Sequence, residues 1–187
     1  MDTEKNGLIQ KVIALETEMF VGVRSSVPAP CQQDLEAFSL HREAQVYPWS
    51  EKTLKSYLSD LLCARRQGLN LMTIKYARMG EQIPPYSCNP LIAKLVEQFL
   101  CWQIETKEKF PKVMQGSRTI EDFCTYLASE LETYSDRTLE LLASDVASFL
   151  AEGKNMTVST YERLANRYGF SSLRAMEEHF SRKKLGL

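Results

Sequence analysis

The sequence is poor in the residues that build most metal and nucleophilic sites. Among its 187 residues it has only two histidines, His41 and His179, and they lie far apart. Its five cysteines are widely spread with no Cys-x-x-Cys pair, so the sequence predicts neither a zinc site nor a disulfide framework, and it names no cofactor. We expect reduced thiols, most of them buried as small core residues. The cysteines are Cys31, Cys63, Cys88, Cys101 and Cys124.

Several other signatures are also missing. There is no G-x-G-x-x-G or G-x-x-x-x-G-K-[ST] phosphate loop, and neither histidine stands in a recognisable nucleophile motif. No apolar run approaches the roughly 18 residues of a membrane span. The sequence begins with acidic residues, where a signal peptide would be basic. We therefore expect a cytoplasmic protein that is not associated with a membrane.

Charge of one sign does not dominate either. Lys and Arg total 23 against 24 Asp and Glu, which gives a net charge of -1, so a general nucleic-acid binder is not expected. With 44% hydrophobic and 25% charged residues, the composition is that of an ordinary globular protein with a sizeable core.

An internal repeat is the most informative pattern present. Residues 49–79 align without a gap on residues 134–164, an offset of 85, and nine of the 31 aligned pairs are identical. Upstream, with a short slip, LETEMF faces IETKEKF. We expect the two aligned segments to superpose as equivalent helix pairs. The identities include residues that begin and end helices, namely Ser50/Ser135, Gly68/Gly153 and Asn70/Asn155.

Apolar residues recur with helical spacing along the chain, and no strand pattern competes. The prediction is an all-α bundle in one domain, with two pseudo-repeated four-helix units at about 7–80 and 90–168 and a C-terminal helix. Asp60 is expected to pair with Arg78, and Asp145 with Arg163 in the second unit, so that each pair ties the corner between successive helices. The helices are expected at 7–23, 32–47, 51–66, 71–80, 90–110, 119–132, 136–151, 157–168 and 172–183.

Charged side chains fall in the middle of otherwise apolar helix faces. Glu16 does so in the first helix, and Arg42 with Gln45 in the second. The second unit has Leu127 and Glu130 at the positions of Arg42 and Gln45. Because an isolated ion in an apolar core is costly, we expect Glu16 and Arg42 to be buried and paired with each other or with a ligand.

Two interpretations of this cluster stay open, a structural ion pair that fixes helix register and a binding site. As a site, Arg42 would bind a carboxylate or phosphate as a planar fork, Gln45 would orient it, and Trp49 would wall the pocket. The hypothesis is a small anionic metabolite bound in a polar pocket of the first unit, by Glu16, Arg42, Gln45, Trp49 and Lys75.

Two alternatives belong to other functional classes. The first is an enzyme that uses Glu16 as a general base or a metal ligand, which a raised pKa of Glu16 or a bound divalent cation would favour. A dry and fully paired Glu16 and Arg42 would instead favour a scaffold or binding role. The second is a protein-interaction adaptor, which would expose a large apolar patch.

Several motifs occur in an order that resembles a known family. They are LETEMF, the pair CQ at 31–32, HREAQ followed by Trp49 and Ser50, TLKSYLSDL, GLNLMTIKYARM and ELETYSDRTLE. The chain resembles, over nearly its whole length, a bacterial family catalogued as domain of unknown function 4125. Leu69 stands where that family has arginine in GRNL, which weakens any role for a basic residue there.

The resemblance implies a stand-alone bacterial protein and assigns no catalytic residues. It also suggests a nucleotidyltransferase-like protein as a possible partner, because related chains accompany such domains.

Overall fold

The computed structural model describes residues 2–23 and 34–183, and in these ranges all nine regular elements are α-helices. The predicted all-α class is therefore confirmed. The first helix begins at residue 2 rather than 7, and the start expected for the second, at residue 32, lies outside the described residues. The helices are α1 (Asp2–Val21), α2 (Leu35–Val46), α3 (Glu51–Arg66), α4 (Leu71–Met79), α5 (Leu91–Lys109), α6 (Ile120–Leu131), α7 (Asp136–Ala151), α8 (Met156–Arg167) and α9 (Leu173–Lys183).

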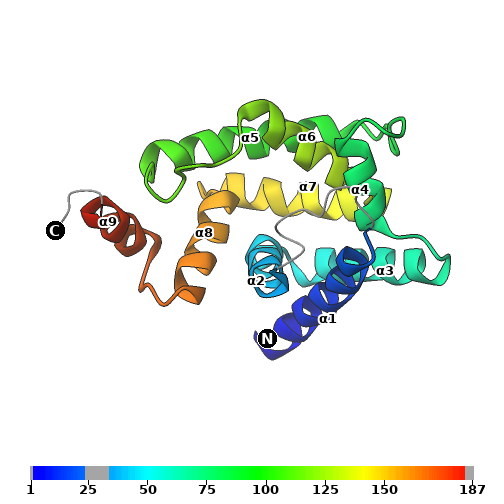
Figure 1. Ribbon diagram of the computed structural model, residues 1–187, viewed down its shortest axis with the longest axis horizontal. Coiled ribbons are helices and arrows are strands. Elements are labelled where there is room, and N and C mark those ends of the chain that lie inside the picture. Colours follow the sequence, from blue (N-terminus) through cyan, green and yellow to red (C-terminus); the bar gives the residue numbers. More distant parts are fainter. Residues whose placement is uncertain (1, 24–33, 184–187) are drawn as a thin grey trace.

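The helices pack around a core to which α1–α4 (the first half) and α5–α8 (the second half) both contribute. Figure 1 shows α7 along the middle of the molecule, between α5 and α3, with which it is in contact. Helix α1 packs against α2, α3 and α4, and α9 packs against α8 at one end of the molecule. Among the described residues, no helix has the length and apolar character needed to cross a membrane.

Both halves turn the same helical corner. Gly68 and Gly153 follow α3 and α7 with φ angles of 70° and 63°, in the left-handed region that glycine adopts without steric cost. Asn70 and Asn155 then cap α4 and α8, each accepting a backbone N–H three residues on. The predicted capping residues are thus in place.

Two aspartates join the halves by reciprocal contacts. Asp145 on α7 accepts the backbone N–H of Ser50 at 2.8 Å and the hydroxyl of Thr53 at 2.6 Å, at the start of α3. Asp60 on α3 accepts the backbone N–H of Ser135 at 3.1 Å and, at 2.6 Å, the hydroxyl three residues on, at the start of α7. A carboxylate at a helix N-terminus also interacts favourably with the helix dipole. Each helix therefore holds the first turn of the other.

The predicted pairing of Asp60 with Arg78 is wrong. Arg78 Nε instead donates to Glu132 Oε2 at 2.7 Å, and its counterpart Arg163 donates from Nε to Glu43 at 3.0 Å. The reason is that α4 packs against α6, and α8 against α2, so each arginine faces a helix of the opposite half.

The contacts of α1 and α5 also correct the alignment between them. The side-chain amide of Asn70 donates to the carbonyl oxygen of Met19 at 2.7 Å, and that of Asn155 to the carbonyl of Trp102 at 3.2 Å. Met19 and Trp102 therefore take matched positions, an offset of 83, which differs from the slipped alignment of LETEMF with IETKEKF. The internal duplication as a whole stays a prediction.

Cysteines do not fill the core as expected. Cys63 and Cys124 are half-buried, while Cys88 and Cys101 are exposed, and all four are free thiols. The geometry of a helix explains the case of Cys101, since the next residue, about 100° around the helix, is the buried Trp102. Cys31 lies outside the described residues.

The reciprocal contacts predict matched losses of stability. Asp60→Ala and Asp145→Ala should each lower the free energy of unfolding by about 1.5 to 3 kcal/mol, because each removes a charged acceptor from two donors. Urea denaturation would measure both. Glu108→Ala, which removes an exposed carboxylate of α5, serves as the control and should change stability by less than about 0.5 kcal/mol. Losses confined to one aspartate would contradict the reciprocal arrangement.

Candidate functional site

Glu16 and Arg42 form a buried two-point ion pair, as the sequence predicted. Arg42 Nε donates to Glu16 Oε2 at 2.9 Å, and Arg42 Nη2 donates to Glu16 Oε1 at 2.6 Å. Glu16 has an exposed fraction of 0% and Arg42 of 3%. This parallel geometry is the strongest form of an arginine–carboxylate contact. It joins the C-terminal half of α1 to the C-terminal half of α2.

A second carboxylate, Glu130 of α6, extends the ion pair into a network. Its Oε1 accepts from Arg42 Nη1 at 2.7 Å, and its Oε2 accepts from Lys75 Nζ of α4 at 2.6 Å. Lys75 is 3% exposed, so it enters the core together with its partner. Two carboxylates thus balance two cations, and the network (Glu16, Arg42, Lys75 and Glu130) has no net charge.

Two tyrosines complete the hydrogen bonding of the carboxylates. Tyr57 of α3 donates its hydroxyl to Glu16 at 2.6 Å, and Tyr134 donates to Glu130 at 2.7 Å. Their rings lie 4.6 Å apart between centroids, and the ring of Trp49 meets both edge-on. Among the described residues, no buried side-chain nitrogen or oxygen lacks a hydrogen-bond partner. The network therefore meets the condition under which buried charge is tolerated.

The charges of the network fix its protonation states. Burial alone would raise the pKa of Glu130, but the charges of Arg42 and Lys75 and the hydrogen bonds that it accepts hold that pKa far below its ordinary value. Burial raises the pKa of Tyr57 well above its usual value, and the neighbouring charge of Glu16 raises it further. Tyr134 is shifted upward by burial and by Glu130 in the same way. At neutral pH, Glu130 is therefore ionised, and both tyrosines are hydrogen-bond donors.

Only part of the predicted site faces open space. A cavity of about 200 Å³ lies next to the network, and Gln45 and Trp49 line it, whereas Glu16, Arg42 and Lys75 do not. Gln45 links the two, because its side-chain oxygen accepts from Arg42 Nη1 at 2.5 Å. The donors of Arg42 are directed at Glu16, Gln45 and Glu130. Two of the five residues predicted for the ligand site therefore line a cavity, and most of its other walls come from the second half.

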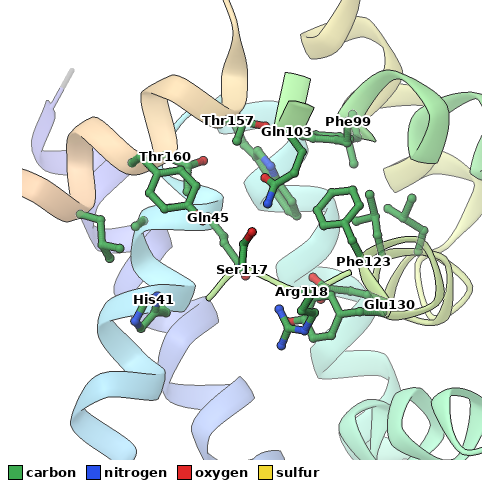
Figure 2. A pocket seen from close by; sticks show the side chains of 18 of the residues that line it. His41, Gln45, Phe99, Gln103, Ser117, Arg118, Phe123, Glu130, Thr157 and Thr160 are labelled. Carbon is green, nitrogen blue, oxygen red and sulfur yellow. The ribbon is translucent and has the colours of Figure 1, made fainter. Parts of the chain in front are cut away.

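The cavity lies between α2, α5, α6 and α8, next to the segment that leads into α6. Its walls are largely aromatic and apolar, with several hydroxyl and amide groups, and Figure 2 shows these side chains around the space. A wider hollow of about 520 Å³ adjoins it, since four residues line both. The shared residues are His41, Ser117, Tyr161 and Leu164.

The predicted repeat pairs four residues of the cavity with residues of the network. The alignment uses an offset of 83 residues between α1 and α5 and of 85 residues farther along. It pairs three cavity residues with ions of the network and a fourth with the tyrosine that donates to Glu16. All four are uncharged, and two of them replace an ion with an apolar side chain. The pairs are Phe99 for Glu16, Leu127 for Arg42, Leu142 for Tyr57 and Thr160 for Lys75.

Glu130 belongs to the network but was not among the predicted site residues, although it aligns with Gln45 in the predicted repeat. The available signal was the same as for Glu16, because Glu130 also interrupts an apolar stripe, between Leu127 and Leu131. Tyr57 gave no such signal. It lies on the apolar face of α3, where a tyrosine is ordinarily core, and only its contact with Glu16 reveals a polar role.

The geometry favours the structural interpretation of the Glu16–Arg42 pair. Both oxygens of Glu16 accept hydrogen bonds inside the core, and Glu16 does not line the cavity. Within the described ranges, no group of three or more histidine, cysteine, aspartate or glutamate side chains is placed to hold a metal ion. The cavity can instead surround a small molecule with aromatic walls and offer it hydrogen-bond donors and acceptors.

Comparison with protein-family models gives one match. The model described as "Protein of unknown function (DUF4125)" matches residues 6–178, so it spans the network, the cavity and the first half of α9. Comparisons with curated proteins and with solved structures gave no match.

The network predicts that a single substitution lowers the free energy of unfolding more than the double substitution of an ion pair does. Arg42→Met should lower the free energy of unfolding by about 3 to 5 kcal/mol, because it leaves Glu16 buried with only the hydroxyl of Tyr57. Adding Glu16→Gln should recover part of that loss, since the remaining Glu130–Lys75 pair is balanced. Urea denaturation of both variants is the measurement, and small, additive losses would contradict the network.

The lowered pKa of Glu130 predicts a loss of stability in acid. A glutamate in the unfolded chain titrates near pH 4.3, so the contribution of Glu130 should be fully present at higher pH and should fall as the pH drops below about 4.3. The double variant Lys75→Met/Glu130→Gln removes this proton uptake and should show a shallower decline between about pH 5 and 3. Parallel curves for wild type and variant in urea denaturation would contradict the assignment.

Proposed function

We propose that this protein, which belongs to the DUF4125 family, binds a small organic molecule in the cavity between α2, α5, α6 and α8. The proposal rests on one observation. Where the first half has Glu16, Arg42 and Lys75 of the ion network, the predicted repeat gives the second half the uncharged residues Phe99, Leu127 and Thr160, which line open space. A core evolved only for packing has no use for such a space, since each void costs stability.

The size of the cavity suits a ring compound. An apolar cavity of about 150 Å³ in another protein binds benzene, so a cavity of about 200 Å³ accommodates one aromatic ring with a substituent. The adjoining hollow of about 520 Å³ leaves room for a longer group on the side of His41 and Ser117. The ring would pack against aromatic side chains of the walls, namely Trp49, Phe99, Phe123, Tyr126, Tyr134 and Tyr161.

Polar groups in the walls would orient such a ligand. The oxygen of the Gln45 side chain is held by Arg42, which leaves the amide nitrogen as a donor on the side chain that reaches the cavity. Thr157 and Gln103 lie at the end of the pocket opposite His41 in Figure 2. A few placed polar groups in an aromatic chamber are typical of small-molecule sites.

The alternatives have less support. The enzyme hypothesis needs a base that reaches substrate, but Glu16 is fully buried and bonded, and Glu130 is held ionised by two cations. The adaptor hypothesis needs a large apolar surface, whereas the two most exposed large apolar side chains of the described residues, Val21 and Ile120, lie at the end of α1 and the start of α6.

A bacterial source, a cytoplasmic location and a nucleotidyltransferase-like partner remain predictions from the sequence. Free thiols at the four described cysteines support the reducing cytoplasm.

Filling the cavity should abolish ligand binding without unfolding the protein. We expect compounds with one or two aromatic rings to raise the melting temperature of the wild type in a thermal-shift screen, by linkage of binding to folding. Leu127→Trp should remove that rise, because Leu127 is half-buried and lines the cavity. Thr160→Phe tests the same space from α8. Leu58→Trp, at a half-buried position of α3 outside the cavity, is the control and should keep the response. If no compound stabilises the wild type, or if hits persist in both filled variants, the proposal is wrong.

A further inference from the structure

One charged side chain of the cavity has no ionic partner in the described part of the chain. Arg118, just before α6, lines the cavity and is exposed, and no carboxylate of the described residues lies within 4.0 Å of its nitrogens. The other cations beside the cavity, Arg42 and Lys75, are both paired inside the network. Glu130, the carboxylate that lines the cavity, is bound by these two cations, so Arg118 is left without an ionic partner among the described residues.

Arg118 is held in place by an aromatic ring. Its guanidinium carbon lies 4.1 Å from the centroid of the Tyr126 ring, and Lys75 Nζ lies 3.7 Å from the same centroid. Such cation–π contacts orient a guanidinium without using its hydrogen-bond donors. Arg118 thus remains free to bind an anion with several N–H groups, while Tyr126 connects it to the buried network.

The charge of Arg118 acts on both sides of the cavity. Partial burial lowers the pKa of His41, and the positive charge of Arg118 lowers it further. Burial raises the pKa of Tyr161 on α8, while a hydrogen bond with Gln103 and the charge of Arg118 act in the opposite direction. In Figure 2, His41 and Arg118 lie on opposite walls at one end of the pocket, away from Thr157 and Phe99. That end carries the charged side chains Arg118 and Glu130, and the opposite end is aromatic and neutral.

We infer that the ligand is an aromatic acid, with its ring in the aromatic chamber and its anionic group bound by Arg118. This inference rests on the proposed function and adds the chemical class to it. A carboxylate at Arg118 would receive charge-assisted N–H···O bonds, and it would neutralise the one unpaired cation that the described residues place on the cavity.

Matched probes separate charge from shape. Phenylacetate and phenylacetamide have nearly the same size, but only the first is anionic at neutral pH, and indole-3-acetate and indole-3-acetamide form a larger pair. We expect the acid of at least one pair to bind the wild-type protein about tenfold more tightly than its amide in isothermal titration calorimetry. Arg118→Gln should bring the two affinities together and leave that of the amide unchanged.

A control variant and the cavity-filling variant distinguish failure of this inference from failure of the proposed function. Arg174→Gln removes an exposed charge of α9 that lines neither hollow, so it should keep the preference for the acid. Binding of acid and amide with equal affinity, or a preference that survives Arg118→Gln, would overturn the inference while the cavity remains a binding site. Binding of other ring compounds but of none of these four would also overturn it. Only if no compound binds in a way that Leu127→Trp blocks does the proposed function fail as well.

Discussion

Burial of four charges in one core is the constraint on which the rest of the structure depends. A carboxylate or ammonium group loses several kcal/mol of solvation free energy when it leaves water, and only close partners with good geometry compensate for that loss. Glu16, Arg42, Lys75 and Glu130 meet this condition only when α1, α2, α4 and α6 come together in one relative position. Sliding any of these helices by one turn, about 5.4 Å, would leave at least one charge alone. The network therefore acts as a register lock for helices from both halves of the chain.

A second set of polar contacts, outside the network, also joins the halves. Asp60 and Asp145 each accept two hydrogen bonds from the first turn of the facing helix, so the starts of α3 and α7 are held by each other. The pairs Arg78–Glu132 and Arg163–Glu43 repeat this exchange between α4 and α6 and between α8 and α2. Helices of one half are thus completed by residues of the other, which explains why a single core includes both.

The network and the cavity are two solutions to one packing problem. Where helices meet in matched corners, the space between them must be filled, and between α1, α2, α4 and α6 long charged side chains fill it. In the second half shorter or uncharged side chains such as Leu127 and Thr160 leave about 200 Å³ open. The bonded half supplies the rigid wall, through Gln45 and Trp49, against which a ligand would be oriented. The asymmetry between the halves that the sequence revealed is therefore the basis of the proposed site, although the open space lies on the opposite side from the one expected.

The sequence by itself determined the helices, their caps and the inward direction of Glu16 and Arg42. These features depend on residues within a few positions of one another, because helical periodicity and capping are local, and the bounds of α3 and α7 were accordingly predicted without error. Tertiary structure alone decided the partners. Glu130 lies 88 residues from Arg42, and nothing local to either side chain specifies that contact. It also decided where the cavity lies, because an open space is the mismatch in volume between helices that only the packed chain brings together.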